Sequence, residues 1–460
     1  MNQSDSNNDK QNKNVKGITK ISVSGYKSLY DECSIEVRPL TILAGANSSG
    51  KSSIMQPLLL MKQTLEATYD PGALLLNGPN VKFTSATQLF SKISRIKPNN
   101  KFTVGIGIEN DQIISNVFTT HKKEAIEIVE MIYKGNEQEF SLLPDMLPGD
   151  VMNVLPKPYI EIYDAIQDTE TLKNRMTWIV NRNRCFLEFS LSTKEKYNII
   201  SQNPLFNFLY SSPSEVFGNY IRQIIHVPGL RGNPERNYKI TAIGDEFPGT
   251  FENYVASVIN YWQKGKNNKT IKELCAALET LGLTCKVQAR QVNDTQVELR
   301  VGRLPRNSDA KDDMVNIADV GFGVSQTLPV LVALLVAEPG QLVYIEQPEI
   351  HLHPRAQIAM AEILSNAAKR GVKVVVETHS DKLILAIQSL VAEGNLSPDI
   401  VKLHWFTRQE NGITNVNSAD LDETGAFGDW PEDFGDLSLQ LENRYLSAAE
   451  ARLMQGVHGG

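Results

Sequence analysis

Residues 45–52 have the composition and spacing of a phosphate-binding loop. They read GANSSGKS between apolar runs at residues 40–44 and 54–65, which predicts a strand before the loop and a helix after it. The glycines allow backbone N–H groups to close around a β-phosphate, and the helix N-terminus adds about half a positive charge. Lys51 would bridge the β- and γ-phosphates, and Ser52 would give its hydroxyl to Mg²⁺. We therefore predict ATP and Mg²⁺ as cofactors, bound by Gly45, Asn47, Ser49, Gly50, Lys51, Ser52 and Ser53.

A second group of polar side chains follows an apolar stretch near residue 345. Residues 341–354 read QLVYIEQPEIHLHP, in which an apolar strand ends in acidic residues that could reach a metal ion. Residues 374–380, VVVETHS, follow at the spacing of one helix and place His379 where it could reach a γ-phosphate. His351 and His353 could also be a metal pair, but the further ligands that a metal site needs are not evident nearby.

Residues 319–326, DVGFGVSQ, open an apolar helix predicted over residues 327–336. Gly321 and Gly323 at a helix start would expose N–H groups to an anion. A helix packed on the sheet that carries the phosphate loop is badly placed to reach that loop as well. We therefore predict that this anion is held by another subunit.

The elements that position these loops follow from periodicity and turn signals. Residues 19–23 alternate as a strand, and residues 33–37 return beside it after a turn. Antiparallel hairpins are predicted, one at the alternating residues 102–108 and one over residues 126–143. Ser212, followed by Pro213 and Glu215, predicts a capped helix start. Residues 150–215 are weakly patterned and expected to be mainly helical, and Pro57 inside the first helix has no evident explanation.

Composition bounds the class of protein. With 460 residues, 41% hydrophobic and 22% charged, we expect a globular protein with more than one lobe. No run approaches the roughly 18 apolar residues of a membrane span, and no signal-peptide core is evident, so we expect a cytoplasmic location and no membrane partner. The four cysteines are widely spaced, which predicts reduced thiols.

Charge gives no general sign of nucleic-acid binding. The net charge is −7, far from the basic field of a typical nucleic-acid-binding domain. A small cluster leaves local DNA or RNA contact open, although a solvated loop and helix start explains it more simply. The cluster comprises Lys264, Lys266, Lys269 and Lys272.

The motifs together resemble the ABC-type ATPase heads shared by SMC-like repair proteins, overcoming-lysogenisation-defect (OLD) proteins and bacterial anti-phage defence ATPases such as the Septu ATPase. GANSSGKS, VGFGVSQ, IEQPEIHLHP and ETHS occur in the order that these heads require, and the resemblance covers most of residues 17–435. It implies that Glu346 is the Walker B metal ligand beside Ser52, that Gln347 takes the catalytic-glutamate position and that His379 is the switch histidine.

The same resemblance implies roles for three loops. Residues 351–354 would form the D-loop, and a signature loop containing Gly321, Gly323 and Ser325 would contact ATP across a dimer. Lys27 lies in a turn that resembles the aromatic-Lys-Ser turn beside the nucleotide in SMC-like heads. The implied partner is a second copy of the chain in a head-to-head dimer, with a higher oligomer left open.

The fold implied is α/β, an ABC-type P-loop ATPase head with an antiparallel β subdomain and a mixed, partly helical insertion. No sustained heptad repeat lies between the motifs, which argues against a long coiled-coil arm. The expected division is a disordered tail at 1–16, the N-terminal part of the head with Walker A at 17–120, an insertion at 121–215, a mixed α/β segment at 216–310, the C-terminal part of the head at 311–435 and a tail at 436–460.

Departures from the pattern bear on turnover. The usual Asp-Glu pair is Glu346-Gln347, so the metal carboxylate is one methylene longer and the general base is an amide. Alignment on the glycines leaves Ser325 one turn late for the signature serine, and Gln88 is only a weak candidate for the Q-loop glutamine. Because an amide cannot accept a proton from water, we expect a slow or impaired ATPase. Glu349 would lie about 7 Å further along if the strand continued, and Pro348 is expected to end the strand first, so Glu349 is a possible but poorly placed substitute base.

Three functions remain compatible with these residues. The first is a nucleotide-dependent switch or scaffold in an anti-phage defence complex with a separate nuclease effector, since no nuclease constellation is evident after residue 400. The second is an SMC-like DNA-repair or chromosome-maintenance ATPase, which would need a basic groove. The third is an ATP-binding scaffold without turnover, which Gln347 favours. Arg231 and Arg236 follow a short strand and could face a phosphate, a partner or a surface carboxylate.

Overall fold

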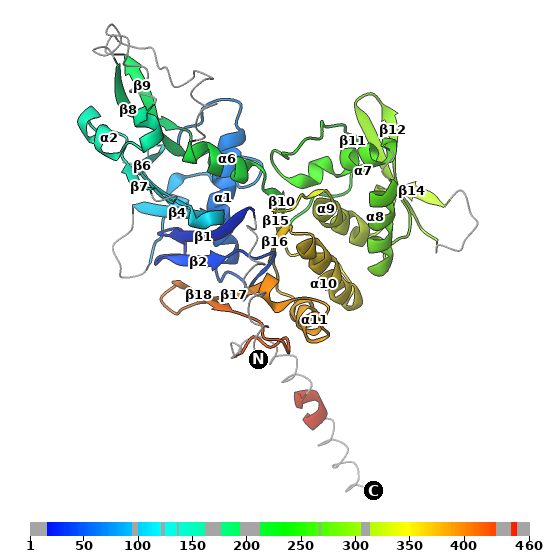
Figure 1. The fold of residues 1–460 in the computed structure, drawn as a ribbon. Helices are drawn as coiled ribbons and strands as arrows, with labels where there is room; N and C mark the ends of the chain where they lie inside the picture. Colours follow the sequence, from blue (N-terminus) through cyan, green and yellow to red (C-terminus); the bar gives the residue numbers. More distant parts are fainter. Residues whose placement is uncertain are drawn as a thin grey trace, which may run out of the picture.

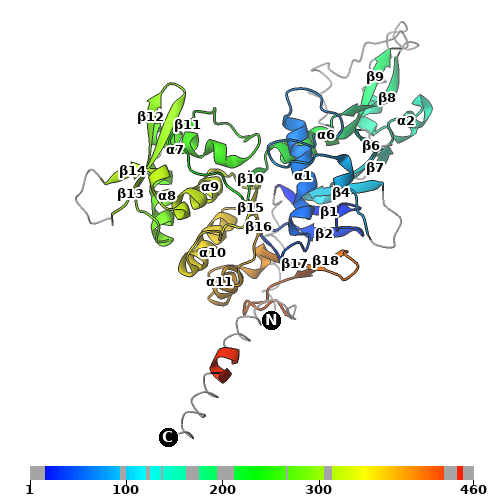
Figure 2. The same ribbon diagram turned by 180° about the vertical axis from the view of Figure 1, so that it is seen from behind.

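A computed structural model of the chain describes residues 16–93, 100–120, 125–135, 138–161, 176–193, 212–265, 268–304, 313–428 and 443–448. Two sheets lie at the centre with helix α1 (Lys51–Glu66) beside them, and a helical lobe and a β-rich lobe extend to either side (Figures 1 and 2). The predicted tails lie almost wholly outside the described residues.

One six-stranded sheet carries the predicted phosphate loop. Its order is β10-β15-β16-β3-β17-β18, parallel from β10 to β17 and antiparallel at β18. Because β16 lies between β3 and β15, the strand that precedes His379 is the direct neighbour of the phosphate-loop strand. The bounds are β3 (Leu40–Gly45), β10 (Ile225–Val227), β15 (Leu342–Glu346), β16 (Lys373–Glu377), β17 (Val401–Arg408) and β18 (Thr414–Ala419).

The two faces of this sheet pack on different layers because side chains alternate along each strand. Ile42 and Val343 belong to the core shared with the helical lobe, whereas Leu43 and Tyr344 belong to the core shared with α1 and the antiparallel sheet. Both faces are therefore covered, which explains the continuous apolar runs of the strands. The helical lobe contains α7 (Val255–Lys264), α8 (Asn268–Thr280), α9 (Phe322–Val336), α10 (Pro354–Lys369) and α11 (Asp381–Ala392).

The second sheet is antiparallel, in the order β2-β1-β4-β5-β6-β7. It confirms the predicted return strand and both predicted hairpins, and the first hairpin turns at Asn110 and Asp111, which have positive φ angles of 59° and 56°. β5 and β6 pair across the boundary expected at residue 120, so the insertion begins inside this sheet. The bounds are β1 (Ile18–Ser24), β2 (Cys33–Glu36), β4 (Lys101–Ile108), β5 (Ile113–Thr120), β6 (Ile126–Gly135) and β7 (Gln138–Leu142).

The insertion corrects one expectation from the sequence. Residues 150–215 were expected to be mainly helical, but β8 (Met176–Asn183) and β9 (Phe186–Thr193) form an antiparallel hairpin beyond α2 (Pro148–Val154). The buried side chains Trp178, Phe186 and Leu191 stabilise it by packing into the core of the antiparallel lobe. Tertiary packing thus outweighs a weak local pattern.

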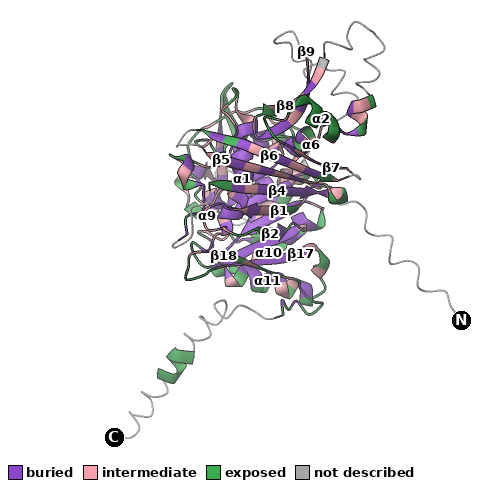
Figure 3. Cartoon of the chain, turned by 90° about the vertical axis from the view of Figure 1, so that its left-hand side faces the viewer, coloured by how far each residue is buried: buried purple, intermediate pink, exposed green. Residues whose placement is uncertain are grey.

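The predicted capped helix is confirmed as α6 (Pro213–Arg222), whose N-cap Ser212 accepts a hydrogen bond from the Glu215 N–H. A smaller sheet, with β11 (Tyr238–Lys239), β12 (Val287–Asn293), β13 (Gln296–Gly302) and β14 (Met314–Asn316), borders the helical lobe. Figure 3 shows buried residues concentrated in the central strands and exposed ones at the periphery. Among the described helices, none is long and apolar enough to cross a lipid bilayer.

Candidate functional site

A polar pocket of about 690 Å³ lies where β3 and β16 end. Its wall contains most of the residues predicted to bind the nucleotide, and it also contains Gln56, Glu377 and Arg408, which the sequence did not single out. Its volume lies in the range of small-molecule sites. The predicted residues on the wall are Lys27, Asn47, Ser49, Gly50, Lys51, Ser52, Ser53, Gln347 and His379.

The phosphate loop has the backbone that its glycines predict. Gly45 and Gly50 have positive φ angles of 141° and 107°, which disfavour other residues. A Cβ atom on Gly50 would lie 2.7 Å from Thr414 Oγ1. Thr414 Oγ1 also donates to the Ser49 carbonyl at 2.7 Å, so strand β18 supports the loop from outside.

Lys51 is folded into the loop that it follows. Its Nζ donates to the carbonyls of Gly45 and Ala46 at 3.0 and 2.8 Å, and only 3% of the residue is exposed. Burial lowers the pKa of the Lys51 ammonium, although the nearby carboxylates of Glu377 and Glu349 oppose that shift. The Lys51 ammonium thus lies on the concave side of the loop, where it could contact the phosphates of a bound nucleotide.

The carboxylate in contact with Ser52 is that of Glu377. Ser52 Oγ donates to Glu377 Oε1 at 2.9 Å, and Tyr344 Oη donates to Glu377 Oε2 at 2.9 Å. Burial raises the pKa of Glu377, with a contribution from the neighbouring Glu346 charge, while the Ser52 and Tyr344 hydroxyls oppose the shift. Glu377 is the last residue of β16, so the sequence signal was an acidic strand end directly before Thr378 and His379.

Glu346, the predicted metal ligand, is turned toward β10 and the segment that follows it. Its Oε1 lies 3.1 Å from His226 Nε2, and its Oε2 accepts from the Gly229 N–H at 3.0 Å. Burial alone would raise the pKa of Glu346, but these hydrogen bonds outweigh it and the pKa is lowered. Glu346 and Glu377 are register partners on adjacent strands, so the metal role of Glu346 stays a prediction with a second carboxylate beside it.

These oxygen donors fit Mg²⁺. The ion is commonly held by one or two carboxylates together with substrate phosphates rather than by a complete protein cage. The Ser52 hydroxyl and the Glu377 carboxylate supply such a partial set. In the described part of the chain, no group of three or more His, Cys, Asp or Glu side chains is arranged as a metal site, and this includes the surroundings of His351 and His353.

Strand β15 ends at Glu346, as expected from Pro348, and the chain then turns sharply. Gln347 has a positive φ of 46° and donates its N–H to the Glu377 carbonyl at 2.7 Å. Glu349 Oε1 accepts from Thr378 Oγ1 at 2.8 Å and from the His379 N–H at 2.9 Å, whereas its Oε2 is buried without a partner among the described residues. The turn thus brings Glu349 against the segment that carries His379.

The signature loop lies apart from the phosphate pocket of its own chain. Gly321, Gly323 and Ser325 are all absent from the wall of that pocket. Helix α9 begins at Phe322 rather than at residue 327, so Gly321 is its exposed N-cap and Ser325 lies in the first turns, where Ser325 Oγ donates to the Phe322 carbonyl at 3.1 Å. The Phe322 ring is 51% exposed and stands 5.9 Å from the His351 ring.

The one glutamine that the sequence suggested for the Q-loop lies outside the pocket wall, and two residues that the sequence did not single out lie on it. Gln88 bonds its own turn at Thr84 and does not line the pocket. Gln56 does line it, and its Oε1 accepts from Lys27 Nζ at 2.5 Å. Arg408, at the end of β17, is on the wall and donates weakly to the Ser48 carbonyl at 3.4 Å.

The two arginines after β10 have different environments. Arg236 is exposed and pairs with Asp319 at 2.6 Å, the surface alternative that the sequence left open. Arg231 is only 5% exposed and faces backbone carbonyls. In the basic cluster, Lys264 donates to Gln291 Oε1 and Lys269 lies 3.7 Å from Glu273, while Lys266 falls outside the described residues.

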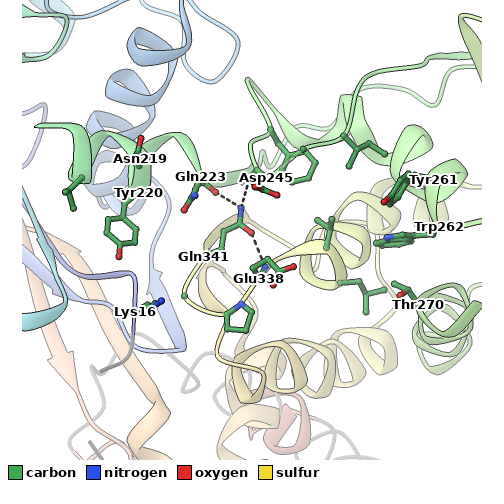
Figure 4. A pocket seen from close by; sticks show the side chains of 18 residues that line it. Lys16, Asn219, Tyr220, Gln223, Asp245, Tyr261, Trp262, Thr270, Glu338 and Gln341 are labelled. Carbon is green, nitrogen blue, oxygen red and sulfur yellow. Dashed lines mark hydrogen bonds between the residues drawn. The ribbon is translucent and has the colours of Figure 1, made fainter. Parts of the chain in front are cut away.

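A larger cavity of about 910 Å³ opens between the two lobes at the amino end of β15 (Figure 4). Gln341 crosses its floor and donates from Nε2 to the Gln223 carbonyl at 2.8 Å. Lys16, Asp245 and Glu338 stand on its wall. Glu346 ends the same strand at the opposite edge of the sheet, so this cavity is separate from the phosphate pocket.

Comparison with known proteins places most of the head in one family. The family described as AAA ATPase domain matches residues 17–384. No curated protein matches the chain. With the sheet order and the phosphate loop, the family match confirms the predicted fold class, an ABC-type P-loop ATPase head with an antiparallel β subdomain.

Three solved structures are similar at low identity. An SMC head bound to the C-winged helix domain of ScpA is 15% identical, covers 88% of this chain and 98% of that chain, and has a TM-score of 0.44. The SMC head domain from Thermotoga maritima is 11% identical, covers 87% of this chain and 98% of that chain, and has a TM-score of 0.40. The Pyrococcus furiosus Smc head domain with an extended coiled coil, bound to the C-terminal domain of ScpA, is 14% identical, covers 88% of this chain and 96% of that chain, and has a TM-score of 0.43.

Proposed function

Because the chain belongs to the AAA ATPase domain family, we propose that it binds Mg-ATP in the phosphate pocket and hydrolyses it slowly. The observation that carries this proposal is the convergence of Lys51, Ser52, Glu377 and His379 on one pocket at the ends of adjacent strands. Those residue types supply a cation, a hydroxyl, a carboxylate and an imidazole, the set that phosphoryl transfer from ATP uses.

Each group has a distinct task in the proposed site. Lys51 neutralises phosphate charge from within the loop, and Ser52 with Glu377 holds the metal ion, with Glu346 next to them. When bound, Mg²⁺ neutralises charge that develops on the phosphates. Burial and the Lys51 charge lower the pKa of His379, so its imidazole is neutral at pH 7 and can hydrogen-bond a γ-phosphate oxygen without adding charge.

Slow turnover is proposed because an amide occupies the place of the base. Gln347 lines the pocket and can orient water but cannot accept its proton. One buried oxygen of Glu349 has no partner within the described ranges, yet its other oxygen accepts from Thr378 and His379, and Glu349 does not line the pocket. We therefore keep Gln347 as the water-positioning residue and expect a long-lived ATP-bound state.

The second half of the site is proposed to come from another copy. Gly321 is exposed, and among the described residues nothing beyond its two chain neighbours lies within 4 Å of the position that a Cβ would take there. Phe322 beside it is 51% exposed, and Leu230, on a segment packed against α9, is 93% exposed. Exposed helix-start N–H groups flanked by apolar side chains fit a γ-phosphate and a protein surface together.

At the level of biology, we propose a cytoplasmic switch or scaffold in an anti-phage defence complex with a separate nuclease effector. The resemblance of the motifs to defence ATPases and the expected long-lived ATP state support this role. A scaffold that binds ATP without turnover is the second candidate, favoured by Gln347. Loss of phage protection in Lys51→Ala, and co-purification of a nuclease with the wild-type chain, are the expected results.

The decisive biochemical experiment is complementation between two inactive variants. Lys51→Ala removes the phosphate-loop cation, and Gly321→Asp places a negative charge against the incoming γ-phosphate without a clash in its own chain. In a mixed dimer, one of the two shared sites keeps both an intact Lys51 and an intact Gly321. Random mixing at equal concentration should restore about a quarter of the wild-type ATPase rate.

The control is Gly149→Asp, which also has open space at the substituted position but lies on α2. It should hydrolyse ATP at the wild-type rate. A mixture no more active than its separate components, with both variants folded, would contradict a site shared between two copies. Wild-type protein that binds no Mg-ATP would contradict the ATPase proposal itself.

A further inference from the structure

Residues 226–232 form a strap that crosses from β10 to helix α9 and to the end of β15. His226 at its start contacts Asn80 Oδ1 at 3.0 Å and Glu346 Oε1 at 3.1 Å. The Gly229 N–H donates to the other oxygen of Glu346. The first residues of the strap, which precede Arg231, therefore hold the Glu346 carboxylate at the end of β15.

Arg231 joins two elements with one guanidinium. Its Nη1 donates to the Gln326 carbonyl on α9 at 3.0 Å, and its Nη2 donates to the Glu346 carbonyl at 2.8 Å, with a longer contact of 3.4 Å to the Gln347 carbonyl. Gln326 lies one turn after the signature glycines, and Glu346 with Gln347 ends the strand at the phosphate pocket. The planar fork of arginine suits such a bridge, because its donors point in fixed directions.

Gln326 fastens the strap in return. Its Nε2 donates to the Arg231 carbonyl at 3.3 Å and to the Gly232 carbonyl at 3.1 Å. Both side chains are almost completely buried, at 5% exposure for Arg231 and 4% for Gln326. A buried bridge with reciprocal hydrogen bonds transmits displacement, because stretching it leaves charged or polar groups unpartnered.

The bridge also bears on the backbone of Gln347. A positive φ of 46° is unfavourable for a residue with a side chain, so surrounding contacts must hold it. The Gln347 N–H donates to the Glu377 carbonyl on one side, and the Gln347 carbonyl accepts from the Ile350 N–H at 3.3 Å and from the Arg231 guanidinium at 3.4 Å on the other. Burial lowers the pKa of Arg231 to about 10, which leaves the guanidinium charged at neutral pH.

We propose that Arg231 is a positioning residue that couples the signature helix to Gln347. Closure of a second copy against Gly321 pushes on the start of α9, and the Arg231 bridge carries that displacement to the backbone that aims Gln347 at the attacking water. Arg231 does not line the phosphate pocket, so it acts through the other residues and not on the nucleotide. This inference rests on the proposed ATPase function and adds the link between its two half-sites.

The test compares Arg231→Gln with wild type by ATP titration, steady-state kinetics and hydrogen–deuterium exchange. We expect ATP binding within about threefold of wild type, because the phosphate loop is untouched, and a kcat lower by about tenfold to a hundredfold, because charged hydrogen bonds are lost. Without nucleotide, exchange should rise together at residues 322–328 and 346–350 and stay unchanged in the phosphate-loop helix α1. Arg231→Lys should remain impaired, since one ammonium lacks the planar fork.

Arg290→Gln is the matched control, because Arg290 is an exposed arginine on β12 and should leave every readout unchanged. If Arg231→Gln does not fold, Gln326→Met, which removes only the return bonds, should show the same pattern with a smaller loss of kcat. Folded Arg231→Gln with wild-type kcat and wild-type exchange overturns the inference. Wild-type protein without ATP binding overturns the ATPase proposal instead, and the exchange measurement without nucleotide still decides whether Arg231 links the two elements.

Discussion

The two loops proposed to contact ATP are built in opposite ways. The base of the phosphate loop is enclosed by its own chain, although residues 46–48 at its tip are exposed: Lys51 is 3% exposed, and a Cβ on Gly50 would meet Thr414 at 2.7 Å. The start of the signature loop is open: in the part of the chain that the structure describes, a Cβ on Gly321 would meet nothing within 4 Å beyond its chain neighbours, and Phe322 is 51% exposed. One loop is therefore shaped before ligand arrives, and the other presents a surface that something else must cover.

This difference predicts that ATP affinity and closure against a second copy depend on different loops. An enclosed loop pays little to order itself on ligand, so affinity for ATP should depend on the residues around Lys51. An open loop gains its contacts only in the assembled state, so substitutions there should change assembly and turnover more than affinity. Variants of the enclosed side, ordered from the largest expected effect, show how far this separation holds.

Lys51→Ala should have the largest effect. Two charged hydrogen bonds to phosphate are lost, which predicts ATP binding weaker by about 1,000-fold. The fold should survive, because the partners of the ammonium among the described residues are carbonyls of its own loop. Titration with a fluorescent ATP analogue and circular dichroism measure the two properties. Lys134→Ala, an exposed lysine on β6, is the control, and tight ATP binding by folded Lys51→Ala would sink the phosphate-loop assignment.

Gln347→Glu should raise the rate of hydrolysis by about 100-fold, since it restores a general base worth 10²–10⁴-fold in typical enzymes. Affinity for ATP should change little, because Lys51 and the loop are unaltered. Single-turnover kinetics with radiolabelled ATP give the rate, and sedimentation gives the lifetime of the closed dimer, which should shorten. Wild-type turnover at tens per second, or an unchanged rate in Gln347→Glu, would show that the base lies elsewhere.

Local sequence patterns predicted the phosphate loop well, but they did not predict that Glu377 contacts it. The loop, its flanking strand and helix, and the Ser212 cap depend on neighbours in sequence, so periodicity and spacing identify them. The contact between Ser52 and Glu377 joins residues 325 apart and depends on β16 lying beside β3. Sheet order of this kind arises from long-range pairing, which no single stretch of sequence encodes.

Long-range packing also explains why the sequence did not predict the burial of Arg231. Its sequence neighbours suggested a surface or phosphate-facing arginine, but burial depends on α9 and β15 closing over the strap. Packing also explains Pro57, which lies inside α1 among buried neighbours while the helix continues through it to Glu66. Packing against the sheets on both sides compensates for the missing hydrogen bond.

Glu377→Gln should weaken Mg²⁺ binding in the presence of ATP by about tenfold. The amide keeps the size of the side chain but removes the charge that faces Ser52, and losing an interaction with a charged group typically costs about 1.5–3 kcal/mol, a factor of about ten or more. Titration of the ATPase rate with Mg²⁺ measures the effect, and Glu346→Gln provides the comparison. A larger loss in Glu346→Gln than in Glu377→Gln would return the main metal role to Glu346.

Thr414→Val should have the smallest effect, because it acts on the loop from outside. The Thr414 hydroxyl donates to the Ser49 carbonyl at 2.7 Å and lies 2.8 Å from Ser28 Oγ, so valine leaves a buried carbonyl without its donor. A lost neutral hydrogen bond costs about 1 kcal/mol, which predicts ATP binding weaker by at most about fivefold and a slightly lower melting temperature. Thr407→Val, on the neighbouring strand β17, should change neither property. If Thr414→Val binds ATP as wild type does while the melting temperature falls, then the enclosed loop keeps its shape without β18, and its preorganisation comes from the glycines and Lys51 alone.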